Sequence, residues 1–353
     1  MPPRPSPPSA ATAGQQPPRA GGARPTAARP TLRARLAVRL GLAGLGILGG
    51  LGLLGILWSK PDPGLEAQQE RSIADLAKPP NRPVTVLVIG VDADRLTDPT
   101  NKAAPPGPAN ADALLLLRVN PGGPLQVLGV PTSLAVKLPG QTQLLPLGSL
   151  YRRGGPALTA DAVRDLVGLE PGKPDRYLVV SRGALRSLVD GLGSVEVNPS
   201  ATMRYSDKRQ GLTIDLQGGL QRLKGQQLEH LARYRDPARP VESRLANQQE
   251  VVRSLLKELS LTSQVDALPE LVEKLREEVD TNLSPAEVLS LMAASVGADP
   301  PTQFSTLPLA PPRSGGKDKG GPQQLREMAR SAPDPLWPEP APPEPAGERA
   351  QAP

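Results

Sequence analysis

The sequence contains no cysteine and only one histidine, His230. Without cysteine the chain can form neither a disulfide framework nor a thiolate metal site. A single imidazole also excludes zinc sites built from several histidines. His230 stands in a polar helical run (QQLEHLA), which favours a place on a helix surface over a role in Ser-His-Asp chemistry. The chain has no P-loop and no G-x-S-x-G motif either, so its chemistry must rest on other side chains.

Aromatic residues make up only 2% of the 353 residues, too few for the stacking surfaces of a single-strand nucleic-acid binder. The formal net charge of +6 is concentrated at the N-terminus, because residues 1–39 carry seven arginines and no acidic residue. The remainder has 34 basic and 35 acidic residues. A near-neutral main body binds polyanions poorly, so we expect no nucleic-acid partner.

Residues 40–58 (LGLAGLGILGGLGLLGILW) contain no charged side chain. A helix of this length spans close to the roughly 30 Å hydrocarbon core of a bilayer. Arginines precede this stretch and Trp58 ends it, so the positive-inside rule predicts a cytoplasmic N-terminus. A cleaved signal peptide is the alternative, but the apolar run is long for one and no A-x-A site follows. We predict a single-pass plasma (inner) membrane protein whose main domain is periplasmic or otherwise extracytoplasmic.

The remaining chain divides by composition into a linker at 59–82, a folded domain at 83–310 and a disordered Pro-rich tail at 311–353. Residues 1–39 are predicted to form a second disordered tail, basic and cytoplasmic. Apolar runs predict five strands in the folded domain, at 84–89, 113–119, 125–130, 176–180 and 194–197, and residues 213–216 would add another. Cap and stop signals predict helices at 160–167, 181–192, from 225, from about 244, at 265–279 and at 284–295.

This alternation predicts an α/β fold, a layered mixed β-sheet flanked by helices and preceded by one transmembrane helix.

Arginines gather around a Pro-bounded loop in the stretch GQQLEHLARYRDPARPVESRLANQQ, residues 225–249. Arg233 and Arg235 can share a face only if the helix begun at Gly225 has ended and the backbone is extended there. Arg244 and Gln248 are four residues apart and lie on one side of the next helix, in its first turns. Such guanidinium groups suit a phosphate or a carboxylate, although arginines spaced in this way are most often solvated surface.

Two acidic residues stand at the ends of predicted strands. Asp92 follows the first strand, and Asp112 immediately precedes the second. If these strands are neighbours, both carboxylates lie near one sheet edge, where ligands of open α/β sheets bind. Two carboxylates and diphosphate oxygens are a suitable ligand set for Mg²⁺. The alternative is that both are turn and cap residues.

The order of these blocks is similar to that of the LytR-CpsA-Psr (LCP) family, also described as the cell envelope-related transcriptional attenuator domain. The resemblance covers roughly residues 84–296 and rests on VLVIGVD, ADALLLLRVNP, LVDGLGSVEVNP, ARYR, RLANQQEVV and VDTNLSPAEVLSLM. It implies a phosphotransferase that moves a glycopolymer from an undecaprenyl-diphosphate carrier to peptidoglycan, with the lipid in a pocket of the α/β core and Mg²⁺ helping to bind the diphosphate.

Carried over residue by residue, the resemblance implies Asp92 and Asp112 at the metal and Arg233, Arg235 and Asp92 in the catalytic centre. It implies that Arg244 and Gln248 bind substrate, and we add Arg95 as a substrate-binding candidate.

The chain departs from the family pattern at Asn110, Thr132 and Asn247, where the family usually has arginine. Four other cations could replace these guanidinium groups: Arg95, Lys137, Arg152 and Arg153.

Three functions follow from the resemblance. The first is glycopolymer attachment to peptidoglycan at the membrane. The second is a catalytically weakened polyprenyl-phosphate binding or scaffold protein of the cell envelope. The third, regulation of envelope genes, is disfavoured as direct DNA contact by the external placement and the near-neutral charge of the main domain.

Overall fold

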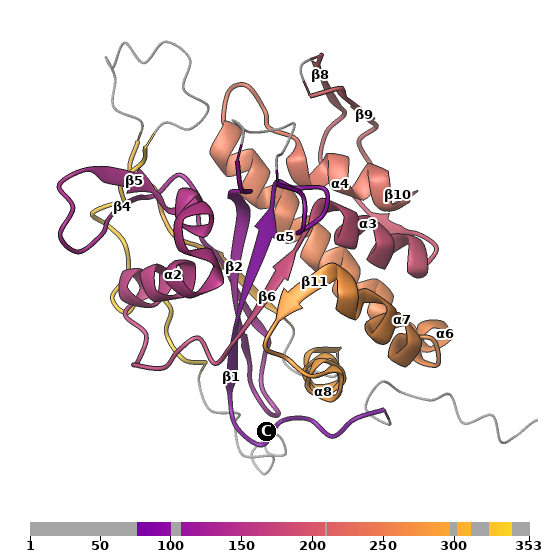
Figure 1. The fold of residues 1–353 in the computed structure, drawn as a ribbon. Coiled ribbons are helices and arrows are strands. Elements are labelled where there is room, and N and C mark those ends of the chain that lie inside the picture. Colours follow the sequence, from indigo (N-terminus) through magenta and orange to yellow (C-terminus); the bar gives the residue numbers. More distant parts are fainter. Residues whose placement is uncertain (1–75, 100–106, 209, 297–301, 312–324, 341–353) are drawn as a thin grey trace, which may run out of the picture. The chain divides into compact units, whose positions relative to one another are not determined.

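A six-stranded mixed sheet forms the centre of the described part of the chain (Figure 1). The structure is a computed structural model that describes residues 76–99, 107–208, 210–296, 302–311 and 325–340. The basic tail, the transmembrane span predicted at 40–58 and most of the predicted linker lie outside these residues. Among the described helices, none has both the length and the apolar composition needed to cross a bilayer.

The strand order in the sheet is β11-β6-β1-β2-β3-β12. These strands are β1 Val84–Val91, β2 Ala111–Val119, β3 Gln126–Gly129, β6 Arg176–Val180, β11 Val279–Thr281 and β12 Gln303–Thr306. β1 pairs antiparallel with β2 and parallel with β6. The outer pairs are antiparallel β2–β3 and β6–β11 and parallel β3–β12. The predicted mixed sheet is confirmed, although its two outermost strands, β11 and β12, were not predicted.

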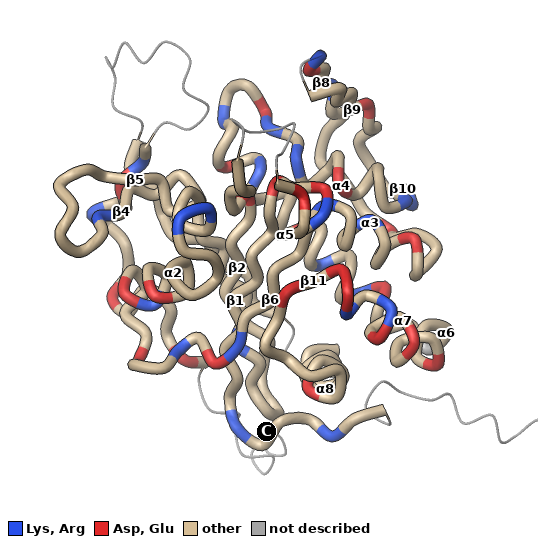
Figure 2. Tube along the Cα trace, in the orientation of Figure 1, with Lys and Arg blue, Asp and Glu red and all other residues tan. Residues whose placement is uncertain are grey.

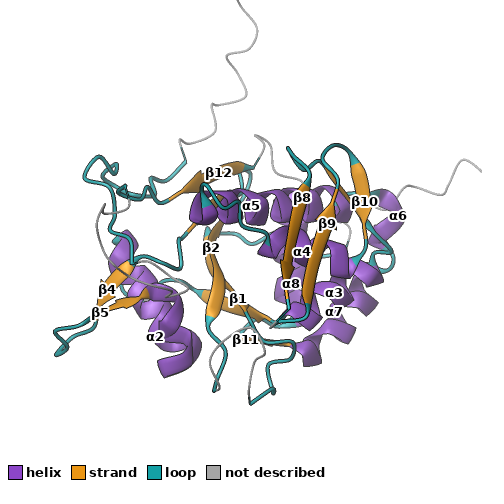
Figure 3. Ribbon diagram, turned by 90° about the horizontal axis from the view of Figure 1, so that it is seen from above, coloured by secondary structure: helices purple, strands orange, loops and turns teal. Residues whose placement is uncertain are grey.

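One face of the sheet is covered by α2, Leu150–Val167 (Figures 1 and 3). The fully buried Leu87 and Ile89 of β1 pack there with Val163 of the helix. The helix ends at Gly168 with a φ of 74°, a left-handed conformation that glycine adopts without strain.

The prediction that this helix begins only at residue 160 was wrong. Thr159 is buried inside the helix, and its Oγ1 donates to the carbonyl of Gly155 at 2.9 Å. Gly154 and Gly155 adopt non-helical angles, so two helical segments of α2 meet at a kink just before Pro156.

Helices α3, α4 and α5 lie on the other side of β1 and β2 (Figures 1 and 3). They span Arg182–Gly191, Gly225–Arg233 and Pro240–Leu259. Ser181 caps α3 as predicted, its Oγ accepting from the amide of Ala184. Apolar side chains of the three helices pack with two small sheets into a second core. The small sheets pair β7 Val195–Val197 with β10 Gln221–Leu223, and β8 Met203–Asp207 with β9 Leu212–Leu216.

The single helix predicted over 265–279 is replaced by several shorter elements. These are α6 Thr262–Val265, α7 Leu268–Leu275, the 3₁₀ turn η3 Arg276–Glu278 and strand β11. A new helix starts at Leu268 because Pro269 fits a first turn but not a helix interior. The last helix, α8 Pro285–Val296, agrees with its prediction. The remaining elements are β4 Ala135–Lys137, β5 Leu144–Pro146 and the 3₁₀ turn η2 Leu147–Ser149.

Residues 325–340, which we call the C-terminal strap, correct the prediction of a disordered tail over 311–353 for that part of the tail alone. Trp337 is only 5% exposed, and the Arg118 guanidinium stacks on its ring at 4.0 Å. Arg118 Nη1 and Gln126 Nε2 both donate to the carbonyl of Pro338, at 3.0 and 3.1 Å. The strap therefore packs against strands β2 and β3.

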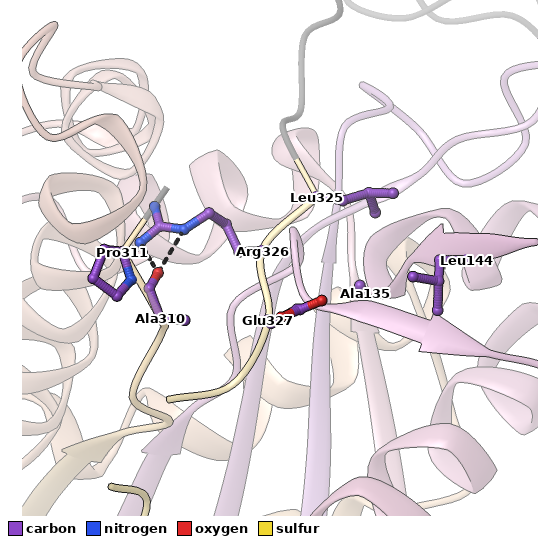
Figure 4. A pocket seen from close by; sticks show the side chains of 7 residues that line it. All are labelled: Ala135, Leu144, Ala310, Pro311, Leu325, Arg326 and Glu327. Carbon is purple, nitrogen blue, oxygen red and sulfur yellow. Dashed lines mark hydrogen bonds between the residues drawn. The ribbon is translucent and has the colours of Figure 1, made fainter. Parts of the chain in front are cut away.

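The start of the strap is fastened by Arg326, which is 8% exposed. Its guanidinium donates twice to the carbonyl of Ala310, at 3.1 and 2.7 Å, beside a small pocket of about 130 Å³ lined by Leu144 and Leu325 (Figure 4). Arg326 Nη2 also lies 3.3 Å from Glu242 in the first turn of α5. The strap is thus connected to the helix that carries two predicted site residues.

Candidate functional site

The backbone after α4 is extended, as Arg233 and Arg235 require if they are to share one face. The helix ends at Arg233, and Tyr234 has φ −59° and ψ 138°, an extended conformation. Arg233 and Arg235 therefore both line one cavity. Arg233 donates to Glu229 at 3.0 Å and to Gln210 at 2.8 Å.

Asp112 owes its position to a β-bulge. Gly90 of β1 pairs with Ala113 of β2, but the next residue, Val91, pairs with Ala111. Asp112 is the extra residue between them, and a bulge of this kind bends the strand and redirects its side chains. As a result, Asp112 and Ala113 both line the cavity although they are adjacent in sequence.

The first turns of α5 cross above this bulge and bring two polar side chains to it. Arg244 is 6% exposed and donates from Nη1 to Asp112 Oδ1 at 2.9 Å and from Nη2 to Thr132 Oγ1 at 2.7 Å. Gln248 donates from Nε2 to the backbone carbonyl of Asp112 at 3.2 Å. Arg235 approaches the same carboxylate at 3.7 Å.

The cavity has a volume of about 860 Å³ and lies between the sheet and α3, α4 and α5. One part of its lining is apolar and comes from β1, β2, β6, β9 and the three helices: Val88, Val91, Ala113, Leu115, Leu178, Val180, Leu185, Leu188, Leu212, Ala232, Val251, Val252 and Leu255. The other part is charged: Asp92, Asp112, Arg152, Arg182, Asp207, Glu229, Arg233, Arg235 and Arg244. Figure 2 shows basic and acidic residues together where the ends of β1 and β2 approach α3, α4 and α5. The arrangement suits an amphiphile with an anionic head.

Two arginines share one carboxylate at this site. Burial raises the pKa of Asp112, but the charges of Arg244 and Arg235 outweigh it and hold the pKa below its ordinary value. Burial lowers the pKa of Arg235, and the like charge of Arg244 lowers it further. A second anion between these guanidinium groups would reduce their repulsion, which favours anion binding.

Glu229 is a residue of the site that the sequence analysis missed. It is 4% exposed and lies against three guanidinium groups, those of Arg233 at 3.0 Å, Arg182 at 3.4 Å and Arg186 at 2.5 Å. A signal was present, because Glu229–Arg233 and Arg182–Arg186 are i, i+4 pairs on helices. The adjacent His230 is half-buried and lies outside the cavity lining, and burial lowers its pKa.

Of the four cations that could replace the missing family arginines, one lines the cavity and three do not. Arg152 lines the cavity, whereas Arg95, Lys137 and Arg153 do not. Arg95 is exposed, so the cavity does not support the prediction that it binds substrate.

Of the other predicted site residues, all line the cavity: Asp92, Asp112, Arg233, Arg235, Arg244 and Gln248.

The donor set fits a magnesium ion of the kind predicted. Asp92 and Asp112 line the same cavity, and one or two carboxylates suffice when phosphate oxygens and waters complete the octahedron. Asp92 is 6% exposed, and its two oxygens accept from the amide (2.8 Å) and the side chain (3.3 Å) of Asn110. In the described part of the chain, no three His, Cys, Asp or Glu side chains cluster as a complete metal site.

Residues 63–316 match the LytR_cpsA_psr family. The chain belongs to this family. The resemblance stated from the sequence is thereby confirmed, over more than half of the chain.

Among curated relatives, the chain is similar to the polyisoprenyl-teichoic acid–peptidoglycan teichoic acid transferase TagV of Bacillus subtilis, with 22% identity over 233 residues. That match covers 65% of this chain and 56% of TagV. It is also similar to the regulatory protein MsrR of Staphylococcus aureus, with 25% identity over 203 residues that cover 57% of this chain and 56% of MsrR. The chain thus matches just over half the length of these relatives.

Solved structures share the fold. The crystal structure of B. subtilis TagV has a TM-score of 0.55 and 19% identity, covering 70% of this chain and 91% of that one. The LytR-Csp2A-Psr enzyme from Actinomyces oris has a TM-score of 0.54 and 18% identity, covering 74% and 95%. The α/β fold with a central mixed sheet flanked by helices is therefore that of the family.

Proposed function

We propose that this protein is a phosphotransferase that moves a glycopolymer from a polyprenyl-diphosphate carrier, of the undecaprenyl class, to a hydroxyl of peptidoglycan. One observation carries the proposal: a cavity whose apolar walls continue into a mouth with five arginines, Arg152, Arg182, Arg233, Arg235 and Arg244. Membership of the family and the transferase activity in the name of TagV support it.

The apolar part of the cavity would hold the lipid tail. Transfer of hydrocarbon from water is favourable by about 0.8 kcal/mol per CH₂ group, so a few isoprene units supply most of the binding energy. The charged residues would then select a diphosphate over an uncharged lipid.

In the transfer step, the acceptor hydroxyl oxygen would attack the phosphorus that carries the glycan. A new P–O bond forms to peptidoglycan, and the bond from that phosphorus to the bridging oxygen breaks. The lipid monophosphate leaves with the bridging oxygen, and the hydroxyl proton is released to water. Arg233, Arg235 and Arg244 would neutralise the charge that develops on the leaving phosphate, since phosphoryl transfer depends on positioning and electrostatics.

A bound Mg²⁺ would add Lewis-acid neutralisation of the same phosphates. Asp92 and Asp112 are the residues of this chain that would hold it. We expect chelation by EDTA to weaken binding of a polyprenyl diphosphate and excess Mg²⁺ to restore it.

For localisation we propose the arrangement that residues 1–60 suggest. An uncleaved anchor at 40–58 would place the domain outside the cytoplasm, where peptidoglycan is accessible. Reporter fusions test this proposal. A reporter enzyme that is active only outside the cytoplasm should be active when it is fused after residue 60.

The first experiment incubates the purified chain with a polyprenyl-diphosphate sugar, a peptidoglycan acceptor and Mg²⁺. Release of lipid monophosphate with glycan on the acceptor is the expected result. Intact lipid that co-purifies without turnover, identified by mass spectrometry, would favour the second candidate, a binding or scaffold protein. The positions Asn110, Thr132 and Asn247, which lack the arginine usual in the family, favour that candidate.

A regulatory role is suggested only by the name of MsrR. The near-neutral charge of the main domain argues against direct DNA contact.

A further inference from the structure

Asp92 and Arg182 follow two neighbouring strands, β1 and β6. β1 and β6 are parallel, and Gly90 pairs with Val180. The backbone segments that follow these two strands stay side by side, because the amide of Arg182 donates to the carbonyl of Ala93. Asp92 and Arg182 both lie two residues further on, and both line the cavity.

The backbone amides around Arg182 already donate hydrogen bonds within the protein. Its amide donates to the carbonyl of Ala93 at 3.0 Å, and the amide of Gly183 donates to that of Asp94 at 3.0 Å. The amide of Ala184 is taken by Ser181. The first amides of α3 are therefore occupied, so any anion at this point must be bound by the side chain.

The Arg182 side chain has weaker partners than its neighbour Arg186. Arg186 lies 2.5 Å from Glu229 and 2.8 Å from Asp94. Arg182 approaches the same two carboxylates at only 3.4 and 3.6 Å. Its Nε is buried and has no hydrogen-bond partner among the described residues, although its side chain is 20% exposed and lines the cavity. Two acids thus serve Arg186 well and leave Arg182 with unused donors.

Charge balance also favours an anion beside Arg182. The cavity lining holds five arginines and four carboxylates, a net charge of +1 before any metal is added. A diphosphate diester carries about two negative charges. Its oxygens could accept hydrogen bonds from the guanidinium of Arg182, whose contacts with Asp94 and Glu229 are long.

We propose that Arg182 is a further substrate-binding residue, which donates to the diphosphate of the carrier from the α3 side of the cavity, opposite Arg244. The inference rests on the proposed function. Arg182 would supply a cation to a site that lacks arginine at Asn110, Thr132 and Asn247.

The test measures binding of farnesyl diphosphate, farnesyl monophosphate and farnesol to the full chain in detergent by isothermal titration calorimetry. Loss of one charge-assisted hydrogen-bond donor pair predicts affinity for the diphosphate about 10- to 100-fold weaker in Arg182→Gln. Affinity for farnesol should stay unchanged, because the apolar walls are intact. Arg276→Gln, at an exposed arginine outside the cavity, is the matched control and should bind all three ligands like the wild type.

Arg182→Lys keeps a positive charge for Glu229 and Asp94 but loses the fork of donors, so it should bind the diphosphate with intermediate affinity. This variant decides the matter if Arg182→Gln does not fold. Wild-type affinity for the diphosphate in the folded Gln or Lys variant overturns the inference and leaves the proposed function standing. An equal loss of farnesol binding also overturns it, since that result assigns Arg182 a structural role. A wild-type chain that binds no diphosphate contradicts the proposed function itself.

Discussion

Replacing Arg244 by methionine tests whether the ion pair with Asp112 holds the site together. The change removes a charged hydrogen bond of 2.9 Å to Asp112 and one of 2.7 Å to Thr132, and it keeps the apolar stem of the side chain. Breaking a fully buried ion pair by removing one partner costs about 3–5 kcal/mol. Asp112 is 36% exposed and retains Arg235 at 3.7 Å, so solvent and the second arginine lower the cost. We expect a loss of about 2–3 kcal/mol in the free energy of unfolding.

The pH dependence gives this prediction a sign. The folded-state pKa of Asp112 is lowered, because Arg244 and Arg235 outweigh the effect of burial. Such a carboxylate stabilises the fold above the ordinary Asp pKa of about 3.9, and its contribution is lost as the pH falls through the folded-state pKa. The difference in stability between the wild type and Arg244→Met should therefore be largest near neutral pH and should narrow below about pH 4.

The measurement is urea unfolding of both proteins at pH 7 and pH 3.5, with Arg276→Met as a control for loss of an exposed arginine. Asp112→Asn and the double variant complete a cycle whose coupling term isolates the pair. A loss below about 0.5 kcal/mol at pH 7, or a difference that does not change with pH, would refute the reasoning.

Three further changes have defined outcomes. Trp337→Ala empties a buried site on the strap and should cost about 3–5 kcal/mol in urea unfolding. Burial raises the pKa of Asp175, but hydrogen bonds from Lys173 and Thr85 outweigh burial and hold this pKa below its ordinary value. The variant Asp175→Asn should therefore be less stable than the wild type at pH 7, and its stability should fall less steeply below about pH 4. Leu188→Trp fills the apolar part of the cavity and should abolish farnesol binding in calorimetry, while thermal unfolding shows a folded protein.

The central strands could be predicted because their residues carry the information locally. The runs at Val84–Val91 and Ala111–Val119 are largely apolar, as expected for strands with both faces covered. Ser181 and Gly168 mark helix ends by their own chemistry, a side-chain cap and a left-handed backbone. These features need no knowledge of distant residues.

The missed elements depend on contacts far apart in sequence. A Pro-rich segment such as 325–340 resembles a disordered tail by composition, and only its contacts with Arg118 and Gln126 reveal that Trp337 has a buried site. Strand β12 is short and gains its place by pairing with β3. The composition of a segment indicates whether the segment can form a core by itself. It does not indicate whether the segment packs on a core formed by other residues.

The site shows the same division. The spacing of Arg233, Arg235, Arg244 and Gln248 indicated one cluster, because the end of α4 and the start of α5 are local features. The position of Asp112 depends on a bulge, and that of Arg182 on the parallel register of β1 and β6. Both are pairing properties that no single segment encodes.

The departures from the family pattern are built into the site and do not simply delete contacts. Asn110 donates to both oxygens of Asp92 through its backbone and side chain. Thr132 accepts from Arg244, and Asn247 donates to the carbonyl of Tyr234 at 3.3 Å, within the segment that carries Arg233 and Arg235. Each position that lacks an arginine thus supports a neighbour that the cavity uses, and restoring one arginine alone would remove that support before it added a charge.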